Sequence, residues 1–213
     1  LAVISKGGKL IAFAQKNNLP HIILPETDLP PRMATGFVIT ALLKLMGQES
    51  EIAKLCDAKF SITSNKEIAE IVGDKIPLFY ASDQNEATAN FWKIIINETS
   101  KRPAFANVFP ELNHNEMTGF ADGDRIGDFI FVFIKDENDN PRIIKRMAVT
   151  KQMLTELGGN FFEINLTGAT RWEKIINSAM LAHWTAFYLA QTKNLDPLAT
   201  PMIEESKKLM ANN

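Results

Sequence analysis

The stretch IPLFYASDQNEATANFWKIIINE, residues 76–98, decides the fold. Residues 76–80 form a short apolar run typical of a buried strand, and Asp83 can cap a following helix that continues to about Glu98. Residues 129–134 form a second fully apolar run. Strands without polar alternation are buried on both faces, which favours a parallel sheet covered by helices. These residues therefore predict an α/β domain.

Residues 1–25 show the same alternation on a smaller scale, as strand, helix and strand. The apolar residues 37–46 then predict a strongly buried helix that ends at Gly47. The more polar residues 48–75 predict a connecting helical region. The chain is thus expected to hold two α/β modules joined by a linker.

The C-terminal part of the chain continues the pattern. Residues 147–149 predict a strand, a helix follows through Leu157, and residues 161–166 predict another strand. This order echoes the N-terminal strand, helix and strand, which suggests two related modules. Two helices, about 169–192 and 201–210, are predicted to finish the chain.

Composition limits the partners and the compartment. The formal net charge of −2 argues against nucleic acid as the main partner, because binding to phosphate backbones requires a basic face. No apolar run of 18 residues is present, so no membrane span is expected. The single cysteine, Cys56, excludes an internal disulfide, and the cytoplasm is the expected compartment. Because Leu1 already lies in a predicted strand, we expect an N-terminal part of a longer protein to be absent.

Glu98 is the strongest candidate for a catalytic base. It shares a helix face with three apolar residues, and a carboxylate on that face can act as a general base. Those apolar residues are Phe91, Ile94 and Ile95. The alternative interpretation is a solvent-exposed carboxylate that pairs with Lys101 or Arg102.

The other polar candidates give weaker signals. His114 lies in a loop near Glu111 and Glu116, but no second histidine stands at metal-ligand spacing, so no metal site is predicted. Arg32 precedes an apolar helix, where it either binds an anion or lies on the surface. Ser5 opens a glycine-rich turn of the kind that can hold phosphate. Lys207 lies in the predicted final helix, which is amphipathic, and is interpreted as a solvated surface charge.

Several phrases occur in the order of one known family. They are SKGGKL (residues 5–10), LPPR (29–32), NE (97–98), FPELNHNE (109–116), YLA (188–190) and DP (196–197). Together they cover essentially the whole chain, which resembles the bifunctional phosphoglucose/phosphomannose isomerases built from two sugar isomerase (SIS) domains. The resemblance implies two flavodoxin-like αβα modules with parallel sheets. Residues 1–50 would be the C-terminal part of the first SIS domain, 51–75 a linker and 76–213 the second SIS domain.

The resemblance also implies an activity and the residues that carry it. The reaction interconverts glucose 6-phosphate or mannose 6-phosphate with fructose 6-phosphate, without a cofactor, in a homodimer with shared active sites. Glu98 matches the glutamate that moves the proton between C2 and C1, and Arg32 the arginine that stabilises the enediolate. His114 matches the histidine that assists ring opening and reaches the neighbouring subunit. Lys207 matches a lysine at the sugar ring, and Thr200 a threonine linked to accepting mannose 6-phosphate.

Two other hypotheses remain open. The first is the isomerase half of a glucosamine-6-phosphate synthase, which also pairs two SIS domains. The second is a module that binds sugar phosphates without catalysis and has no need of Glu98.

Overall fold

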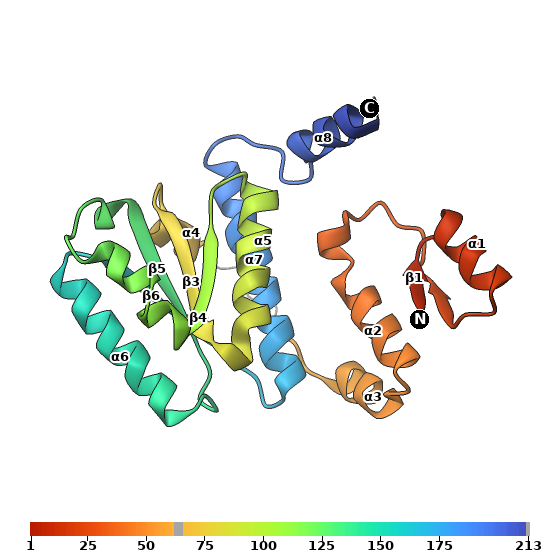
Figure 1. Cartoon of the computed structure of the whole chain (residues 1–213), viewed down its shortest axis with the longest axis horizontal. Helices are drawn as coiled ribbons and strands as arrows, with labels where there is room; N and C mark the ends of the chain where they lie inside the picture. Colours follow the sequence, from red (N-terminus) through yellow and green to blue (C-terminus); the bar gives the residue numbers. More distant parts are fainter. Residues whose placement is uncertain (62–65, 212–213) are drawn as a thin grey trace. The chain divides into compact units, whose positions relative to one another are not determined.

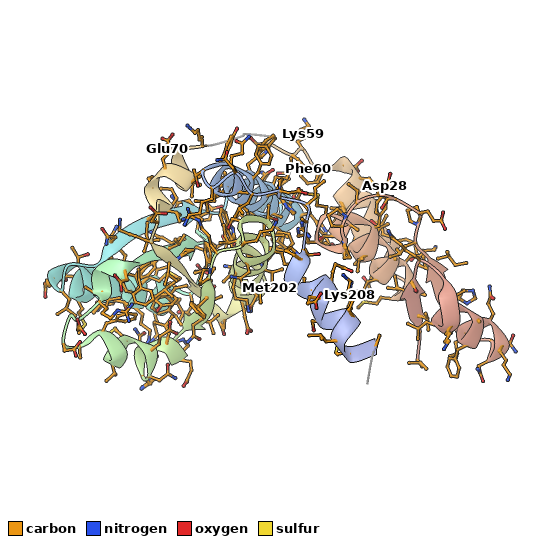
Figure 2. All side chains as sticks on the ribbon, turned by 90° about the horizontal axis from the view of Figure 1, so that it is seen from above. Asp28, Lys59, Phe60, Glu70, Met202 and Lys208 are labelled. Atoms are coloured by element: carbon orange, nitrogen blue, oxygen red, sulfur yellow. The ribbon has the colours of Figure 1, made fainter. Side chains whose placement is uncertain are left out.

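The computed structural model describes residues 1–61 and 66–211, in two compact units. The first unit is Leu1–Lys59 and the second is Phe60–Asn213. Figure 2 labels the two residues at this boundary, Lys59 and Phe60.

The first unit holds a two-stranded parallel sheet whose strands are connected along the chain by a helix. The elements are β1 (Val3–Ser5), α1 (Gly8–Lys16), β2 (His21–Ile23), the 3₁₀ turn η1 (Pro31–Met33), α2 (Thr35–Leu45) and α3 (Glu49–Asp57). Val3, Ile11 and Ala14 are buried together and form its small core. The predicted strand, helix and strand of residues 1–25 are therefore confirmed.

The prediction that α2 is strongly buried is wrong. Ala41 is its only buried residue, while Phe37, Val38 and Leu42 are each more than 40% exposed. The helix is apolar on nearly all sides, and an all-round apolar helix needs more covering surface than a two-stranded sheet offers.

The second unit holds a four-stranded parallel sheet in the order β4-β3-β5-β6 (Figure 1). Its strands are β3 (Ile76–Ser82), β4 (Phe105–Phe109), β5 (Phe129–Lys135) and β6 (Asn160–Asn165). Its α-helices are α4 (Glu67–Val72), α5 (Glu86–Ser100), α6 (Pro141–Glu156), α7 (Arg171–Gln191) and α8 (Pro201–Ala211). Short 3₁₀ turns are η2 (Asp83–Asn85), η3 (Glu111–Asn113), η4 (Glu116–Phe120) and η5 (Ile126–Asp128).

Helices cover both faces of this sheet, as the apolar strands predict. On one face α4, α5 and α7 pack on alternate strand residues such as Phe79 and Val132, with Trp92 at the centre. On the other face α6 and the η3 and η4 turns pack on Tyr80 and Phe131. In Figure 1, α6 lies on one side of the sheet and α5 and α7 lie on the other. The α/β class with parallel sheets is confirmed.

The strand predicted at residues 147–149 is wrong, because these residues lie in the middle of α6. The helix begins at Pro141, and the side chain of Asn140 accepts a hydrogen bond from the Arg142 N–H. Its buried residues, Met147, Thr150 and Leu154, recur at helical spacing. The proposed echo of the N-terminal pattern within residues 147–166 therefore does not hold.

Gly168 lets the chain turn closely against the start of α7. Its φ is +148°, and a Cβ there would lie 2.5 Å from Glu173 Cβ and 2.8 Å from Lys174 N. We expect Gly168→Ala to lower the free energy of unfolding by about 1–3 kcal/mol, because the backbone of α7 must shift. Urea unfolding measures this. Gly127→Ala is the matched control, since a Cβ at Gly127 meets no atom within 4 Å. An equal loss of unfolding free energy in Gly168→Ala and Gly127→Ala would contradict this explanation.

Candidate functional site

Open α/β sheets usually bind ligands at the carboxyl ends of the two strands between which the strand order reverses. In this sheet those strands are β3 and β5. In this chain a buried polar network fills that place. Ser82 Oγ donates to Asp139 Oδ1 at 2.5 Å, and Asn85 Nδ2 donates to both of these oxygens, at 3.1 and 3.0 Å. The groups thus satisfy one another, which indicates a structural role.

Asp136 continues this network with charged partners. Lys174 Nζ lies 2.7 Å from Asp136 Oδ1, and Arg171 Nη1 lies 3.2 Å from Oδ2. Burial by itself would raise the pKa of Asp136. The hydrogen bonds from Lys174 and from the Asn138 N–H, with the charges of Lys174 and Arg171, outweigh burial and hold this pKa below its usual range. The carboxylate is therefore a structural anion that holds α7 to the sheet.

A different pocket, of about 430 Å³, lies at the C-terminal end of α5. Half-buried Glu98, in the last turn of α5, lines it together with Thr200. The remaining lining residues are Asn97, Lys101, Arg102, Pro103, Pro201, Met202 and Ile203. The pocket thus combines one carboxylate and two cationic side chains with an apolar wall.

Two cations hold the segment before α8 against the end of α5. Lys101 ends α5 in the left-handed conformation, with φ at +57°, and its Nζ donates to the Asp196 carbonyl at 2.6 Å. Arg102 is 9% exposed and its Nη2 donates to Thr192 Oγ1 at 3.4 Å. These contacts place the segment that leads to Thr200 beside Glu98.

The α5 face inferred from spacing is partly correct. Ile95 is fully buried and Phe91 packs against the core, but Ile94 is 40% exposed. Glu98 follows Ile95 by three positions and Ile94 by four, so it lies at the border between the buried and exposed faces. That border position explains why its side chain is half-buried and lines a pocket.

His114 and Lys207 do not line the pocket at Glu98. His114 is exposed directly after η3, and η3 packs through Leu112 on the sheet face that α6 covers. Lys207 lies on α8 and pairs with Glu204 at 2.9 Å. Every residue of α8 is exposed, and Figure 2 labels Met202 and Lys208 on this helix. Of the sequence candidates in the second unit, the structure brings Glu98 and Thr200 together.

Arg32 and Ser5 belong to the first unit. Arg32 lies in η1 and is 7% exposed, so the interpretation as a surface arginine is wrong. The Ser5 hydroxyl donates to the Gly7 carbonyl at 3.1 Å and so stabilises its own turn. Lys6 extends from the same turn and donates to the Thr27 carbonyl at 3.1 Å.

Sequence reasoning missed several residues around Glu98. Pro103, Met202 and Ile203 form the apolar wall, and Lys101 is a tether. The feature that could have identified Lys101 is its position at the end of the predicted helix. A residue in the left-handed conformation often turns the chain sharply there. No local pattern links the apolar residues of α8 to α5, because they are about 100 positions apart.

Residues 1–61 and 66–211 contain no group of three or more His, Cys, Asp or Glu side chains placed to hold a metal ion. Within the same ranges, each helix is too short or too polar to cross a bilayer.

Comparisons with known proteins show what this chain is similar to. The family described as the bacterial phospho-glucose isomerase C-terminal SIS domain matches residues 62–210. The bifunctional phosphoglucose/phosphomannose isomerase of Aquifex aeolicus is 29% identical over 96% of this chain and 66% of its own length. That of Caldicellulosiruptor bescii is 31% identical over 99% of this chain and 68% of its own length. The chain thus spans about two thirds of these relatives.

A solved structure shows the same fold at low identity. A glucose-6-phosphate isomerase like protein from Thermus thermophilus matches with a TM-score of 0.65 and 17% identity, over 95% of this chain and 75% of that one. The fold and the relatives place this chain in the class of phosphosugar isomerases built from SIS domains. Within that class, it belongs to the bifunctional phosphoglucose/phosphomannose isomerase family.

Proposed function

We propose that this chain carries the catalytic base of a cytoplasmic aldose–ketose isomerase acting at the start of glycolysis and in gluconeogenesis. The reaction interconverts glucose 6-phosphate or mannose 6-phosphate with fructose 6-phosphate. One observation carries the proposal: Glu98 and Thr200 line a common pocket of about 430 Å³. That volume lies within the range of small-molecule sites. The family of the chain supports the same reaction class.

The proposed chemistry is a proton transfer through a cis-enediolate. Glu98 removes the proton from C2 and returns it to C1, which is general base and then general acid catalysis. Charge develops on the oxygens during this step, and Arg32 is the proposed cation that stabilises it. His114 and Lys207 assist ring opening, Thr200 contacts the sugar and Ser5 the phosphate. The carbonyl moves within one molecule, so the reaction requires no redox cofactor.

A homodimer is part of this proposal. His114 follows η3, on the sheet face away from the face that α5 covers. We therefore expect a second copy of the chain to supply His114 to the pocket at Glu98.

The decisive test is a coupled assay of the full-length enzyme with glucose 6-phosphate and mannose 6-phosphate in separate reactions. Formation of fructose 6-phosphate from either sugar supports the proposal. A third reaction contains glucosamine 6-phosphate, and turnover of this sugar alone would favour the glucosamine-6-phosphate synthase alternative. Binding of hexose 6-phosphates without any turnover would favour a non-catalytic module.

Lys101→Met tests the tether between α5 and the segment before α8. Hydrogen bonds that involve a charged group contribute about 1.5–3 kcal/mol. We expect kcat/KM to fall about tenfold or more, because Thr200 is no longer held beside Glu98. Steady-state kinetics on fructose 6-phosphate measure this effect.

The matched control is Lys193→Met. Lys193 is an exposed cation of the same segment, 3.6 Å from the exposed carboxylate of Asp74, and an exposed pair contributes little. Equal kinetic effects in the two variants would argue against the tether.

A further inference from the structure

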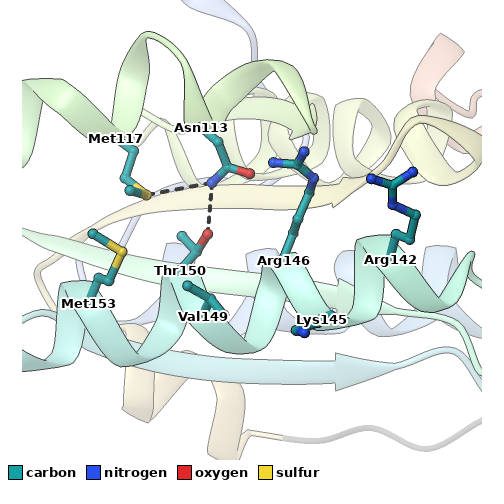
Figure 3. A pocket seen from close by; sticks show the side chains of 8 residues that line it. All are labelled: Asn113, Met117, Arg142, Lys145, Arg146, Val149, Thr150 and Met153. Atoms are coloured by element: carbon teal, nitrogen blue, oxygen red, sulfur yellow. Dashed lines mark hydrogen bonds between the residues drawn. The ribbon is translucent and has the colours of Figure 1, made fainter.

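A second pocket, of about 440 Å³, lies between α6 and the η3–η4 segment (Figure 3). Three of its lining residues are cations from the first two turns of α6, namely Arg142, Lys145 and Arg146. The others are Asn113, Met117, Val149, Thr150 and Met153. It lies on the sheet face opposite the one that α5 and α7 cover, so it is distinct from the pocket at Glu98.

The positive charge of this pocket is uncompensated. No acidic side chain lines it, and none of the three cations forms an ion pair with the described residues. Elsewhere in the second unit, Lys135, Lys151 and Arg171 each have a carboxylate within 3.2 Å. This concentration of charge occurs in a chain whose net charge is −2.

Asn113 adds a fixed polar group. Its Nδ2 donates to Thr150 Oγ1 at 2.8 Å, which holds the amide at the pocket wall. Its Oδ1 is buried and has no hydrogen-bond donor among the described residues. In Figure 3 the amide of Asn113, from η3, and the guanidinium group of Arg146, from α6, lie on the same side of α6. A buried acceptor without a donor is costly, so a ligand hydroxyl beside it would be stabilised.

We infer that this pocket binds a small organic phosphate that carries at least one hydroxyl group. Arg142 and Arg146 bind the phosphate, since a guanidinium group matches phosphate oxygens in charge and geometry. Lys145 adds a third positive charge. Asn113 Oδ1 accepts from the hydroxyl, and Val149 and Met153 contact the carbon chain. The site is independent of the reaction proposed for Glu98.

Isothermal titration calorimetry of the full-length protein with glycerol 1-phosphate tests this site. The double variant Arg142→Gln/Arg146→Gln is expected to weaken binding about 100-fold, or tenfold for each charged hydrogen-bond donor removed. The matched control, Arg125→Gln/Lys66→Gln, removes two exposed cations outside the pocket and is expected to stay within twofold of the wild type. Isomerase turnover is expected to be unchanged in both variants.

A second comparison tests the hydroxyl contact. Methyl phosphate has no hydroxyl on its carbon, so it is expected to bind more weakly than glycerol 1-phosphate. Asn113→Ala should remove this difference without abolishing phosphate binding. If the double arginine variant does not fold, the single variants Arg142→Gln and Arg146→Gln carry the test.

Three results would overturn the inference. The first is glycerol 1-phosphate binding that the double arginine variant leaves within twofold of the wild type. The second is equal weakening in the Arg125 and Lys66 control. The third is a double variant whose main change is a shift in oligomeric state, which would assign these arginines to an interface between copies.

Discussion

Glu98→Gln is expected to lower the kcat of the full-length enzyme on fructose 6-phosphate by about 10²–10⁴-fold, the usual contribution of a general base. Glutamine has the same size and keeps a polar group in the pocket, but it cannot accept the proton from the sugar carbon. KM should change little, because the substitution leaves the pocket walls in place. Steady-state coupled assays measure kcat and KM.

Glu86→Gln is the matched control for this variant. Glu86 is an exposed carboxylate in the first turn of the same helix, at the end away from the pocket. Its replacement should leave turnover unchanged, and circular dichroism should show both variants folded. Wild-type turnover in Glu98→Gln would remove the proposed mechanism, although the fold and the family would stand.

Asp136→Asn is expected to lower the free energy of unfolding by about 3–5 kcal/mol, because it leaves buried Lys174 without its closest counter-charge. The side chains of both residues are almost inaccessible, at 2% and 5% exposure. For a domain of this size the loss corresponds to a fall in Tm of roughly 6–20 °C. Differential scanning calorimetry measures it.

Glu137→Gln provides an informative control, because Glu137 pairs with the same lysine at 3.0 Å but is 78% exposed. An exposed partner contributes about 0–1 kcal/mol, so this variant should remain close to the wild type. Similar losses in the two variants would show that burial does not decide the strength of these pairs.

The lowered pKa of Asp136 also predicts a pH dependence. Its folded-state pKa lies below the unfolded value, which is near 3.9. Its contribution is therefore complete above that value and is lost as the pH falls through the folded-state pKa. Asp136→Asn should remove this part of the acid sensitivity, so the stability difference between wild type and variant should shrink at low pH.

The sequence predicted the elements with the clearest local patterns. Strands β3 and β5 follow from continuous apolar runs, and β6 follows from a shorter, mixed run. Helices α5 and α7 follow from helical spacing. The strand predicted at residues 147–149 is wrong because three consecutive apolar residues cannot distinguish a strand from a helix. Asn140 and Pro141 provide the signal that was missed, since an Asn cap followed by proline is typical of a helix start.

Strand β4 was not predicted because it has no continuous apolar run. Phe105 is 53% exposed and Asn107 interrupts the apolar run, so these residues lack the pattern of a buried strand. Its pairing with β3 depends on contacts distant in sequence.

The candidate site was only partly accessible to sequence reasoning. Helical spacing placed Glu98 at the end of α5, and the family resemblance pointed to Thr200, which lines the same pocket. The tether from Lys101 to the Asp196 carbonyl depends on a backbone conformation that no pattern of residues specifies. The three cations at the start of α6 were not recognised as a cluster. A strand was predicted at residues 147–149, whereas the helix α6 brings these cations together.

The exposed helix α8 has a consequence for how freely the pocket at Glu98 can vary. Glu98 stands on a helix packed into the core, whereas Met202 and Ile203 belong to a helix with no buried residue. Substitutions at such exposed positions typically alter stability by no more than about 0.5 kcal/mol. The wall of the pocket can therefore vary while Glu98 stays fixed. A directed-evolution library aimed at a new hexose would best be concentrated at residues 200–203.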